Sequence, residues 1–291
     1  MIQRLNDYLK KEFGEKVYKI ALNGGFTCPN RDGTKGDRGC IFCSAGGSGE
    51  FAEDPNLPIT EQIERGKVRV AEKYHGSSYI AYFQAFTGTY APVERLRELY
   101  SEAISHPDVV CMSVATRPDC LPGEVLDLLA EMNAIKPVWV ELGLQTIHER
   151  TAAYIRRSYD LKEYDRAVRE LKNRNIKVIT HVILGLPKET TDDMKATVSY
   201  VANSGADGIK LQLLHILKGT DLADEYAEGK IKVMSMDEYI EVLRECLGLI
   251  PEDMVVHRMT GDGDKKLLIA PEWSADKKRV MNAIEKMLST T

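Results

Sequence analysis

The chain alternates apolar runs with amphipathic stretches along most of its length, and this alternation restricts the fold more than any other feature. The apolar runs are rich in Val, Ile and Leu and alternate little with polar residues, which is typical of parallel strands covered on both faces. Strands that are each followed by a helix predict a parallel sheet with right-handed crossover connections. Six strands are expected, at 17–22, 78–86, 109–116, 137–146, 177–187 and 208–217.

Six strand–helix units fit either an open doubly wound sheet or a partial barrel. A complete (βα) barrel needs about 200 to 250 residues, and this chain has 291 with no Pro- or Ser-rich linker. We therefore expect one α/β domain, a partial (βα)6 barrel of the TIM type, over residues 1–229. A C-terminal extension is expected at 230–291, with a helix at 235–250, a segment at 255–273 and a final helix. The polar part of that segment, 257–266, suits a lid over the open end of the barrel.

The charge and the cysteine content restrict the partners and the compartment. A net charge of −5 and a pI of about 5.8 argue against binding nucleic acid by bulk charge, although a local basic patch stays possible. The segment 1–16 is charged and lacks the apolar centre of a secretory signal, and no apolar run approaches the roughly 20 residues that span a bilayer. We expect a cytoplasmic protein without membrane association, in which cysteines serve as ligands, catalysts or buried thiols.

Three cysteines lie in the segment GFTCPNRDGTKGDRGCIFCSAGGSG, at 25–49, after the first expected strand. Eleven residues separate Cys28 from Cys40, and two separate Cys40 from Cys43. In parallel α/β folds the ligand site lies beyond the carboxyl ends of the strands, so the loop is where a site is expected. A Cys-x-x-Cys pair chelates one metal centre readily, and the glycines of the long gap allow the third cysteine to fold back.

Three thiolates are compatible with more than one metal centre. A structural zinc site needs four ligands, so zinc would need a distant residue such as Cys111, Cys120 or His181. A 4Fe-4S cluster held by three thiolates leaves one iron open to an exogenous ligand. Unligated thiols are the third interpretation, and the spacing alone does not separate the cluster from zinc.

The second cysteine pair reads CIFC, with the aromatic Phe42 before the last cysteine. Here the sequence resembles the radical S-adenosylmethionine (SAM) superfamily, which carries three cysteines after the first strand of a partial (βα)6 barrel. The long first gap is similar to that of the group typified by the bacterial YhcC and YtqA proteins, relatives of the radical SAM domain of the elongator catalytic subunit. Further matching segments follow in order: YFQAFTGTY, SVATRPDCLP, VELGLQT, HVILGLPKET, KLQLLHILKGT and HRMTGDGDKKLLIAPEW.

The resemblance implies the cofactors. Cys28, Cys40 and Cys43 would hold a 4Fe-4S cluster whose open iron binds SAM. An electron from the cluster would cleave SAM to methionine and a 5′-deoxyadenosyl radical, which removes a hydrogen atom from the substrate. An electron donor such as flavodoxin or ferredoxin is then also implied.

The resemblance also implies residues that hold the amino acid and ribose parts of SAM. The Gly-Gly-Glu segment of most of the superfamily is missing from the second strand end, so Gln84, or the backbone as far as Thr87, would bind the amino group. Glu141 and Gln145 share one face of the fourth strand and would approach the ribose and the amino acid part. A buried structural network is the alternative for these two, because polar groups inside a barrel need partners.

The adenine of SAM would lie along the segment that contains Gly185 and Leu186, where a glycine lets the backbone approach closely. Phe42 would pack against the same ring, unless it is an ordinary core aromatic. His181 is either a site residue or a core histidine.

Candidate substrate residues lie at strand ends and in the expected lid. Arg117, in ATRPD, could hold a carboxylate or phosphate, or it could pair with Asp119 as scaffold. His215 follows the sixth strand at the rim of the barrel. His257, Arg258 and Lys265 belong to the lid segment, which could bind phosphates or be a solvated loop.

Three classes of function compete: a radical SAM enzyme, a zinc-containing barrel hydrolase, and a non-catalytic cluster or metal carrier. The hydrolase lacks a chelating pair among its scattered histidines, and the carrier does not explain motifs at successive strand ends. Kinship with the elongator subunit implies tRNA as the partner and the 5-substituent of the wobble uridine as the target, converted from carboxymethylaminomethyl to aminomethyl. A small molecule or a peptide is the alternative substrate.

Overall fold

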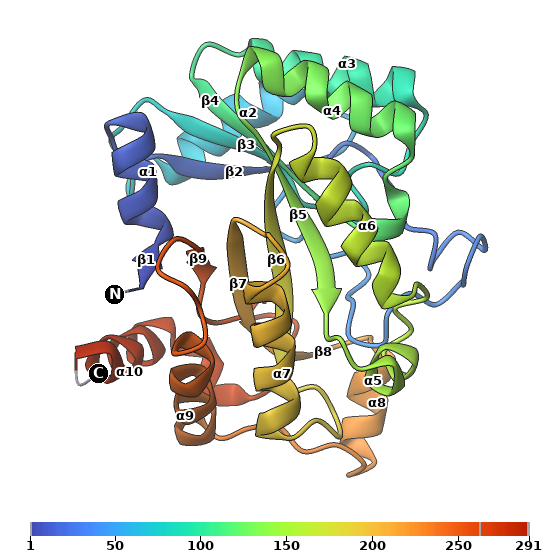
Figure 1. Cartoon of the computed structure of the whole chain (residues 1–291), viewed down its shortest axis with the longest axis vertical. Helices are drawn as coiled ribbons and strands as arrows, with labels where there is room; N and C mark the ends of the chain where they lie inside the picture. The colour runs from blue at the N-terminus through green and yellow to red at the C-terminus, as the bar shows by residue number, and fades with distance from the viewer. Residues whose placement is uncertain (1, 262, 290–291) are drawn as a thin grey trace.

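The computed structural model describes residues 2–261 and 263–289 and has a curled parallel sheet at its centre (Figure 1). The strand order is β1-β9-β7-β6-β5-β4-β3-β2, and every neighbouring pair is parallel. The sheet forms a half-barrel, which confirms the predicted α/β class. Its strands are β1 (Gln3–Arg4), β2 (Tyr18–Leu22), β3 (Tyr79–Phe83), β4 (Val109–Thr116), β5 (Val138–Gln145), β6 (Lys177–Leu184), β7 (Gly208–Leu213) and β9 (Val255–Arg258).

The edge of the sheet beyond β7 differs from the prediction. We expected a lid at 257–266, but its first two residues belong to β9 (Val255–Arg258), which pairs in parallel with β7. The side chains of Val255 and Val256 are buried there and hold the strand against the sheet. β1 then pairs with β9 and ends the sheet.

The sixth predicted strand, 208–217, is also interrupted. β7 ends at Leu213, and β8 (Ile216–Leu217) pairs antiparallel with β10 (Leu268–Ala270) in a separate two-stranded sheet. The residues of the predicted lid that follow β9 therefore return toward the carboxyl ends of the strands. Gly261 and Gly263 lie against the ring of His215, so close that a Cβ on Gly261 would meet the ring at 2.4 Å.

The outer face of the sheet is covered by helices that follow the strands (Figure 1). A single large core of buried apolar residues fills the space between the two layers. Thr190 and Ser235 start two of the helices with reciprocal capping boxes, in which each hydroxyl accepts from a backbone N–H one turn on. The helices of this layer are α2 (Ile59–Val70), α3 (Val93–Ser105), α4 (Gly123–Ile135), α6 (Leu161–Lys172), α7 (Thr191–Ala202) and α9 (Met236–Leu247).

The amino-terminal end of the barrel is closed by α1 (Leu5–Phe13). Leu9 of this helix packs in a small apolar cluster with inward-facing residues from four strands. This end of the interior is therefore filled by side chains, whereas a cavity is present at the carboxyl ends of the strands. The strand residues of the cluster are Ile80, Cys111, Trp139 and Ile179.

Shorter elements lie around the carboxyl ends of the strands and in the C-terminal part. They are η1 (Pro118–Cys120), α5 (Glu149–Tyr154), α8 (Asp221–Ala227), η2 (Glu272–Ala275) and α10 (Lys277–Ser289). The helix expected at 235–250 is present as α9, whereas a domain boundary at 229/230 stays a prediction. In the described part of the chain, no helix combines the length and the apolar character needed to cross a membrane.

Candidate cofactor and substrate site

A cavity of about 260 Å³ lies at the carboxyl ends of the strands, between the barrel interior and the loop that follows β2. Its walls come from inward-facing strand positions, and its mouth is formed by the cysteine loop. Most of the predicted site residues meet here although they come from distant parts of the sequence. These are Cys28, Cys40, Phe42, Cys43, Gln84, Thr87, Arg117, Glu141, Gln145, His215 and Arg258.

The cysteine loop is held in place by two side chains that the sequence analysis did not single out. Asn30 Nδ2 donates to the carbonyl of Arg156 at 2.6 Å and lies 3.5 Å from Cys40 Sγ. Arg31 Nη2 donates to the carbonyls of Cys43 and Ser44 at 2.8 and 2.6 Å. These bonds fix the loop from inside, so the thiols are presented to the cavity before any metal is bound.

One glycine of the loop is required by this arrangement. Gly39 has φ +75°, and a Cβ there would lie 2.8 Å from Arg31 Nε. Any larger residue would have both a strained backbone and a clash with the arginine that supports the loop. The following turn is closed by a bond from Cys43 N to Cys40 O at 3.0 Å.

The donor set fits an iron–sulfur cluster better than a single metal ion. Among the residues that the structure describes, the three sulfurs do not all lie within 4.8 Å of one another. Ligands of one zinc ion would lie roughly 3.8 Å apart, given Zn–S bonds of about 2.3 Å. Cys111 is in the core beside Trp139, and His181 binds Glu141, so neither completes a zinc site without moving.

Burial favours the protonated form of two of the three thiols, those of Cys40 and Cys43. Burial raises the pKa of Cys40 to about 12, and the neighbouring Cys43 thiol adds to the effect. Burial also raises the pKa of Cys43, which the Arg31 guanidinium opposes. Iron must therefore displace protons when the cluster is assembled, because the thiolate is the ligand.

The turn after β3 lies against the cysteine loop. Gln84 Nε2 donates to Ser48 O at 2.5 Å, and Phe86 N donates to Gly47 O at 2.9 Å. Gln84 and Thr87 both line the cavity, as the prediction requires. Their contact with the SAM amino group stays a prediction, and the Gln84 side chain already has one partner in the loop.

A buried charge cluster forms the floor of the cavity. The carboxylate of Glu141 is completely buried, and protein donors surround both of its oxygens. Oε1 accepts from Lys19 Nζ at 2.6 Å and from Ser113 Oγ at 2.7 Å. Oε2 accepts from Lys210 Nζ and lies 2.7 Å from His181 Nε2. The buried network that we kept as an alternative for Glu141 is present, while its contact with SAM stays a prediction.

The environment of this cluster moves the pKa values of its members. Burial would raise the pKa of Glu141, but Lys19, Lys210 and His181 outweigh it and hold the pKa well below its usual range. Burial lowers the pKa of Lys210 to about 7, against the opposing effect of Glu141. Burial also lowers the pKa of His181 to about 4, and Lys210 adds to this. Near neutral pH, His181 is therefore uncharged.

Gln145 sits at an irregularity of the sheet. The register of β5 against β6 shifts between Gly143 and Gln145, and Gln145 has φ +70°. Such bulges re-aim a side chain and are frequent next to functional sites. Gln145 Oε1 is buried without a hydrogen-bond partner, so the site offers an unused acceptor to a donor group such as a ribose hydroxyl.

Arg117 lines the cavity and also pairs with Asp119. Pairing with Asp119 as part of the scaffold was one of the two roles that the sequence left open for Arg117. Its Nε and Nη2 donate to the two oxygens of Asp119, each at 3.0 Å. Lys35 of the cysteine loop binds the same carboxylate. The guanidinium also lies over the ring of Tyr159, 5.3 Å from its centroid. Arg117 thus connects the end of β4 to the cysteine loop.

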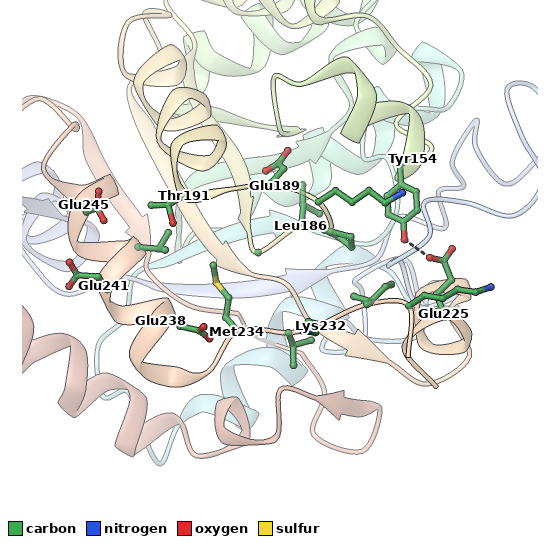
Figure 2. A pocket seen from close by; sticks show the side chains of 17 residues that line it. Tyr154, Leu186, Glu189, Thr191, Glu225, Lys232, Met234, Glu238, Glu241 and Glu245 are labelled. Atoms are coloured by element: carbon green, nitrogen blue, oxygen red, sulfur yellow. Dashed lines mark hydrogen bonds between the residues drawn. The ribbon is translucent and has the colours of Figure 1, made fainter. Parts of the chain in front are cut away.

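Two predicted SAM residues lie outside the lining of this cavity. Gly185 and Leu186 line a second cavity, of about 830 Å³, between the end of β6 and α9 (Figure 2). Figure 2 shows Glu238, Glu241 and Glu245 along one side of it, with Tyr154 bonded to Glu225 on the other. The predicted contact of Gly185 and Leu186 with adenine therefore has no support from this geometry and stays a prediction.

Two predicted substrate residues are also placed elsewhere. His257 is in β9 rather than in a lid, and its ring packs edge-on against Trp139 at 5.4 Å between centroids. Lys265 is exposed and does not line the cavity. Arg258, the next residue to His257, does line it, because the β7–β9 register shifts between Ile209 and Lys210.

Lys19 and Lys210 are the site residues that sequence reasoning missed. Each is a single lysine inside an apolar strand, in VYKIAL and GIKLQL. A lysine in a strand covered on both faces must have an anionic partner or a ligand. This signal could have linked both residues to Glu141, the acidic residue of the VELGLQT strand.

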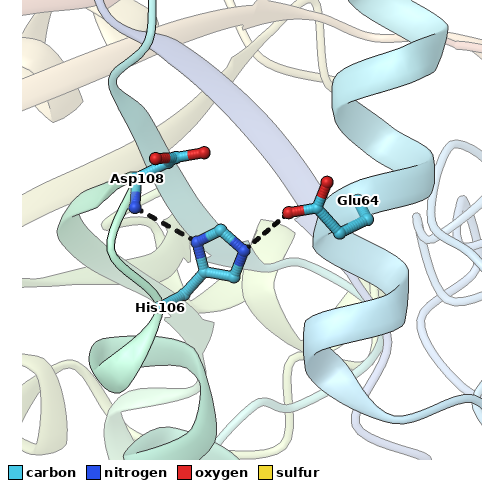
Figure 3. Close-up of side chains that lie close together, drawn as sticks. All are labelled: Glu64, His106 and Asp108. Atoms are coloured by element: carbon cyan, nitrogen blue, oxygen red, sulfur yellow. Dashed lines mark hydrogen bonds and ion pairs between the residues drawn. The ribbon is translucent and has the colours of Figure 1, made fainter.

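A different group of side chains meets the distance criterion for a metal site. Glu64, His106 and Asp108 lie close together on the outer surface (Figure 3). His106 Nδ1 accepts from the backbone of Asp108, and its Nε2 lies 2.8 Å from Glu64. Lys67 Nζ lies 2.9 Å from the Glu64 carboxylate and 2.6 Å from that of Asp108. Its positive charge balances these two carboxylates, as a metal ion would.

Comparison with known proteins gives consistent results for sequence and structure. The family model described as "Radical SAM superfamily" matches residues 30–201, and the "Radical_SAM C-terminal domain" model matches residues 206–290. "Uncharacterized protein YtqA" of Bacillus subtilis (strain 168) is 50% identical over 98% of this chain and 88% of that protein. "Protein YhcC" of Escherichia coli (strain K12) is 37% identical over 97% of this chain and 90% of that protein.

The more distant relatives are matched over a smaller share of their own length. A "tRNA uridine(34) acetyltransferase" of Methanocaldococcus jannaschii is 24% identical over 53% of this chain and 28% of that protein. The solved structure of archaeal Methanocaldococcus infernus Elp3 with an N-terminal deletion has a TM-score of 0.69. It is 16% identical and covers 93% of this chain and 63% of that chain, which is a likeness of fold alone.

Proposed function

Since the chain belongs to the radical SAM superfamily, we propose that it removes a hydrogen atom from the 5-substituent of a tRNA wobble uridine. The substituent that we propose is carboxymethylaminomethyl. Loss of a hydrogen atom and one further electron from its N–CH2–carboxylate carbon, with SAM as the two-electron oxidant, would give an imine, which water would hydrolyse to the aminomethyl product and glyoxylate. Enzymes of this superfamily use a 4Fe-4S cluster and SAM. When bound, these groups supply a 5′-deoxyadenosyl radical, which can break C–H bonds that acids and bases at neutral pH do not break.

The observation that carries the proposal is the position of the cysteines. Cys28, Cys40 and Cys43 stand at the mouth of a cavity whose floor is polar, buried and charged. These three thiols would hold the cluster. The turn at Gln84–Thr87 and the unused oxygen of Gln145 would bind SAM beside it.

The chain itself positions the reactants and excludes water. α1 closes the far end of the barrel, so the cavity opens at the end of the barrel where the cysteine loop lies. Gly261 and Gly263, which line the cavity, lie next to His215 at this end. Bound reactants that fill the cavity would exclude water and protect a reactive intermediate.

Two features support tRNA as the substrate. The first is the similarity to a protein named tRNA uridine(34) acetyltransferase, which acts on the wobble position by its name. The second is the cavity lining, where Arg31, Arg117, Arg157, Lys210 and Arg258 outnumber Glu50 and Glu141. Positive charge along one cavity, of which Arg117, Arg157 and Lys210 also pair with acidic residues, would let a protein of net charge −5 bind an anionic polymer locally. Few phosphate contacts should follow, with a salt slope of about −0.7 per contact on single-stranded RNA.

The test uses reconstituted enzyme, SAM and a reductant under anaerobic conditions, with tRNA isolated from a strain that lacks the gene. We expect tRNA to stimulate formation of 5′-deoxyadenosine, and the wobble nucleoside to lose the mass of a carboxymethyl group. A nucleoside profile of the same strain should show the unconverted substituent. Formation of 5′-deoxyadenosine that tRNA does not stimulate, with no mass change at the wobble position, would contradict the proposal.

A further inference from the structure

The charge cluster at the floor of the cavity contains more positive than negative charge. Lys19 and Lys210 share the single carboxylate of Glu141, so these three buried or half-buried groups carry a net charge of +1 when Lys210, whose pKa burial lowers to about 7, is protonated. Arg258 adds to the positive potential at this place, because it lowers the pKa values of both Lys210 and His181. Excess positive charge in a buried site is unfavourable unless an anion neutralises it.

A ligand can reach this charge. Lys210, His181 and Arg258 all line the cavity that the cysteine loop opens into. Lys210 is nearly buried, with 5% of its side chain exposed, and Tyr82 Oη lies 3.2 Å from its Nζ. Lys210 Nζ donates to Tyr82 Oη and to Glu141, which fixes the ammonium group and leaves one of its three N–H groups for the carboxylate of a ligand.

We propose that Lys210, together with Arg258 and Tyr82, forms an anion subsite that binds the carboxylate of the substrate at the floor of the cavity. This deepens the proposed function and rests on it: the carboxymethylaminomethyl group ends in a carboxylate, and the aminomethyl product does not. A ligand oxygen at Lys210 would direct the substituent into the barrel, away from the polynucleotide. Loss of the carboxylate would then weaken binding and favour product release.

The alternative source of a carboxylate is the methionine part of SAM. Lys210 and the three cluster thiols line the same cavity, so the carboxylate of either reactant could meet Lys210. The binding experiment therefore measures the two affinities separately.

The test measures binding to reconstituted holoenzyme with SAM and without reductant, so that no turnover occurs. The probes are anticodon stem-loop RNAs that carry either 5-carboxymethylaminomethyluridine or 5-aminomethyluridine. Wild-type protein should bind the first about tenfold more tightly than the second, as expected for one charge-assisted hydrogen bond. Lys210→Met should remove this preference and leave SAM affinity unchanged, while Lys162→Met, an exposed lysine of α6, should behave as wild type.

A second measurement needs neither RNA nor a variant. Trace labelling with acetic anhydride and mass spectrometry reports the reactivity of Lys210 in wild-type holoenzyme, with Lys162 as the internal reference. N-methylglycine and malonate should protect Lys210 selectively, and methylamine should not. This measurement stays informative if Lys210→Met folds poorly.

The outcomes separate the subsite from the tRNA proposal. If the two RNAs bind equally but the small carboxylates protect Lys210, the anion subsite is supported and tRNA is the wrong substrate. If no carboxylate protects Lys210, or if Lys210→Met weakens SAM binding instead of RNA discrimination, the subsite is overturned. Loss of the RNA preference in Lys162→Met as well would also overturn it, because the effect would then be one of general charge.

Discussion

Lys19 on β2 and Glu141 on β5 are three strands apart in the sheet, yet Lys19 Nζ and Glu141 Oε1 are 2.6 Å from each other. The pair spans the barrel interior and can exist only because the sheet curls. Lys210 reaches the same carboxylate from β7, on the other side of β5. One buried carboxylate thus joins both halves of the sheet directly beneath the cofactor site.

Glu141→Gln should destabilise the protein strongly, because it leaves two lysines at the barrel floor without their anion. Breaking a buried ion pair by removing one partner costs about 3–5 kcal/mol, and urea unfolding of the two proteins measures the difference. Glu131→Gln, which removes an exposed pair with Arg97, should change the free energy of unfolding little. Iron content should be the same in all three proteins, since the cysteines are intact.

An opposite result for Glu141→Gln would change its assignment. If stability were retained while SAM affinity fell, Glu141 would be a direct SAM ligand, as the sequence resemblance implied. The hydrogen bonds and ion pairs around its two oxygens would then contribute little to the free energy of unfolding.

Replacing Cys28, Cys40 and Cys43 together by Ala should abolish cluster assembly and leave the fold intact. The loop is held by Asn30 and Arg31, whose bonds do not depend on metal. Iron and sulfide analysis after anaerobic reconstitution, with circular dichroism as the control for folding, measures both effects. Iron retained by the triple variant, or zinc bound in anaerobically purified wild-type protein, would exclude this cluster site.

Gln145→Met should weaken SAM binding about tenfold without loss of stability. The side-chain oxygen of Gln145 is a buried acceptor with no partner in the protein, so its removal costs the fold nothing and costs a ligand one hydrogen bond. Equilibrium binding of SAM and thermal unfolding of the same samples give the two quantities. A large drop in stability with unchanged SAM affinity would show that the amide has only a structural role.

Stability should fall as the pH falls from about 6.5 to about 4, in part through His181. Burial lowers the pKa of His181 to about 4 from 6.5, and Lys210 and Arg258 add to this while Glu141 opposes it. Between these values the unfolded chain takes up a proton that the folded chain does not, so protons favour unfolding, by up to about 3 kcal/mol. Above pH 6.5 both states are neutral at this residue, and the contribution is constant.

The variant His181→Gln keeps an N–H donor for Glu141 and removes the titration. The free energy of unfolding of iron-free protein in urea should therefore depend less on pH in the variant than in the wild type between pH 7.5 and 5. Parallel pH profiles for the two proteins would show that His181 is already charged, or already solvated, in the fold.

The strand–helix alternation was sufficient to predict the parallel sheet, because six central strands consist mostly of apolar residues buried on both faces, and the family resemblance favoured the partial (βα)6 barrel. The edge strands could not be predicted in the same way. β1 has two residues, and β9 has four followed by a loop rich in Gly and Asp, so both look like irregular chain until they pair with each other. Short strands are defined by their neighbours rather than by their own sequence.

The residues of the candidate site were also predicted only in part. The cysteines, Gln84 and Gln145 were found because motifs or strand ends marked them. Lys19 and Lys210 were missed because their partner, Glu141, is distant in sequence, and only the curl of the sheet brings the three together. His257 was misplaced because β9 has only four residues, so the sequence did not mark this segment as a strand.

The most direct measurement is transfer of deuterium from substrate to cofactor. A tRNA whose wobble 5-substituent carries deuterium on its carbon atoms is incubated with reconstituted enzyme, SAM and reductant, and the 5′-deoxyadenosine is analysed by mass spectrometry. The account predicts deuterium in 5′-deoxyadenosine, in proportion to the aminomethyl product formed. Unlabelled 5′-deoxyadenosine that accumulates at the same rate with and without tRNA would contradict it.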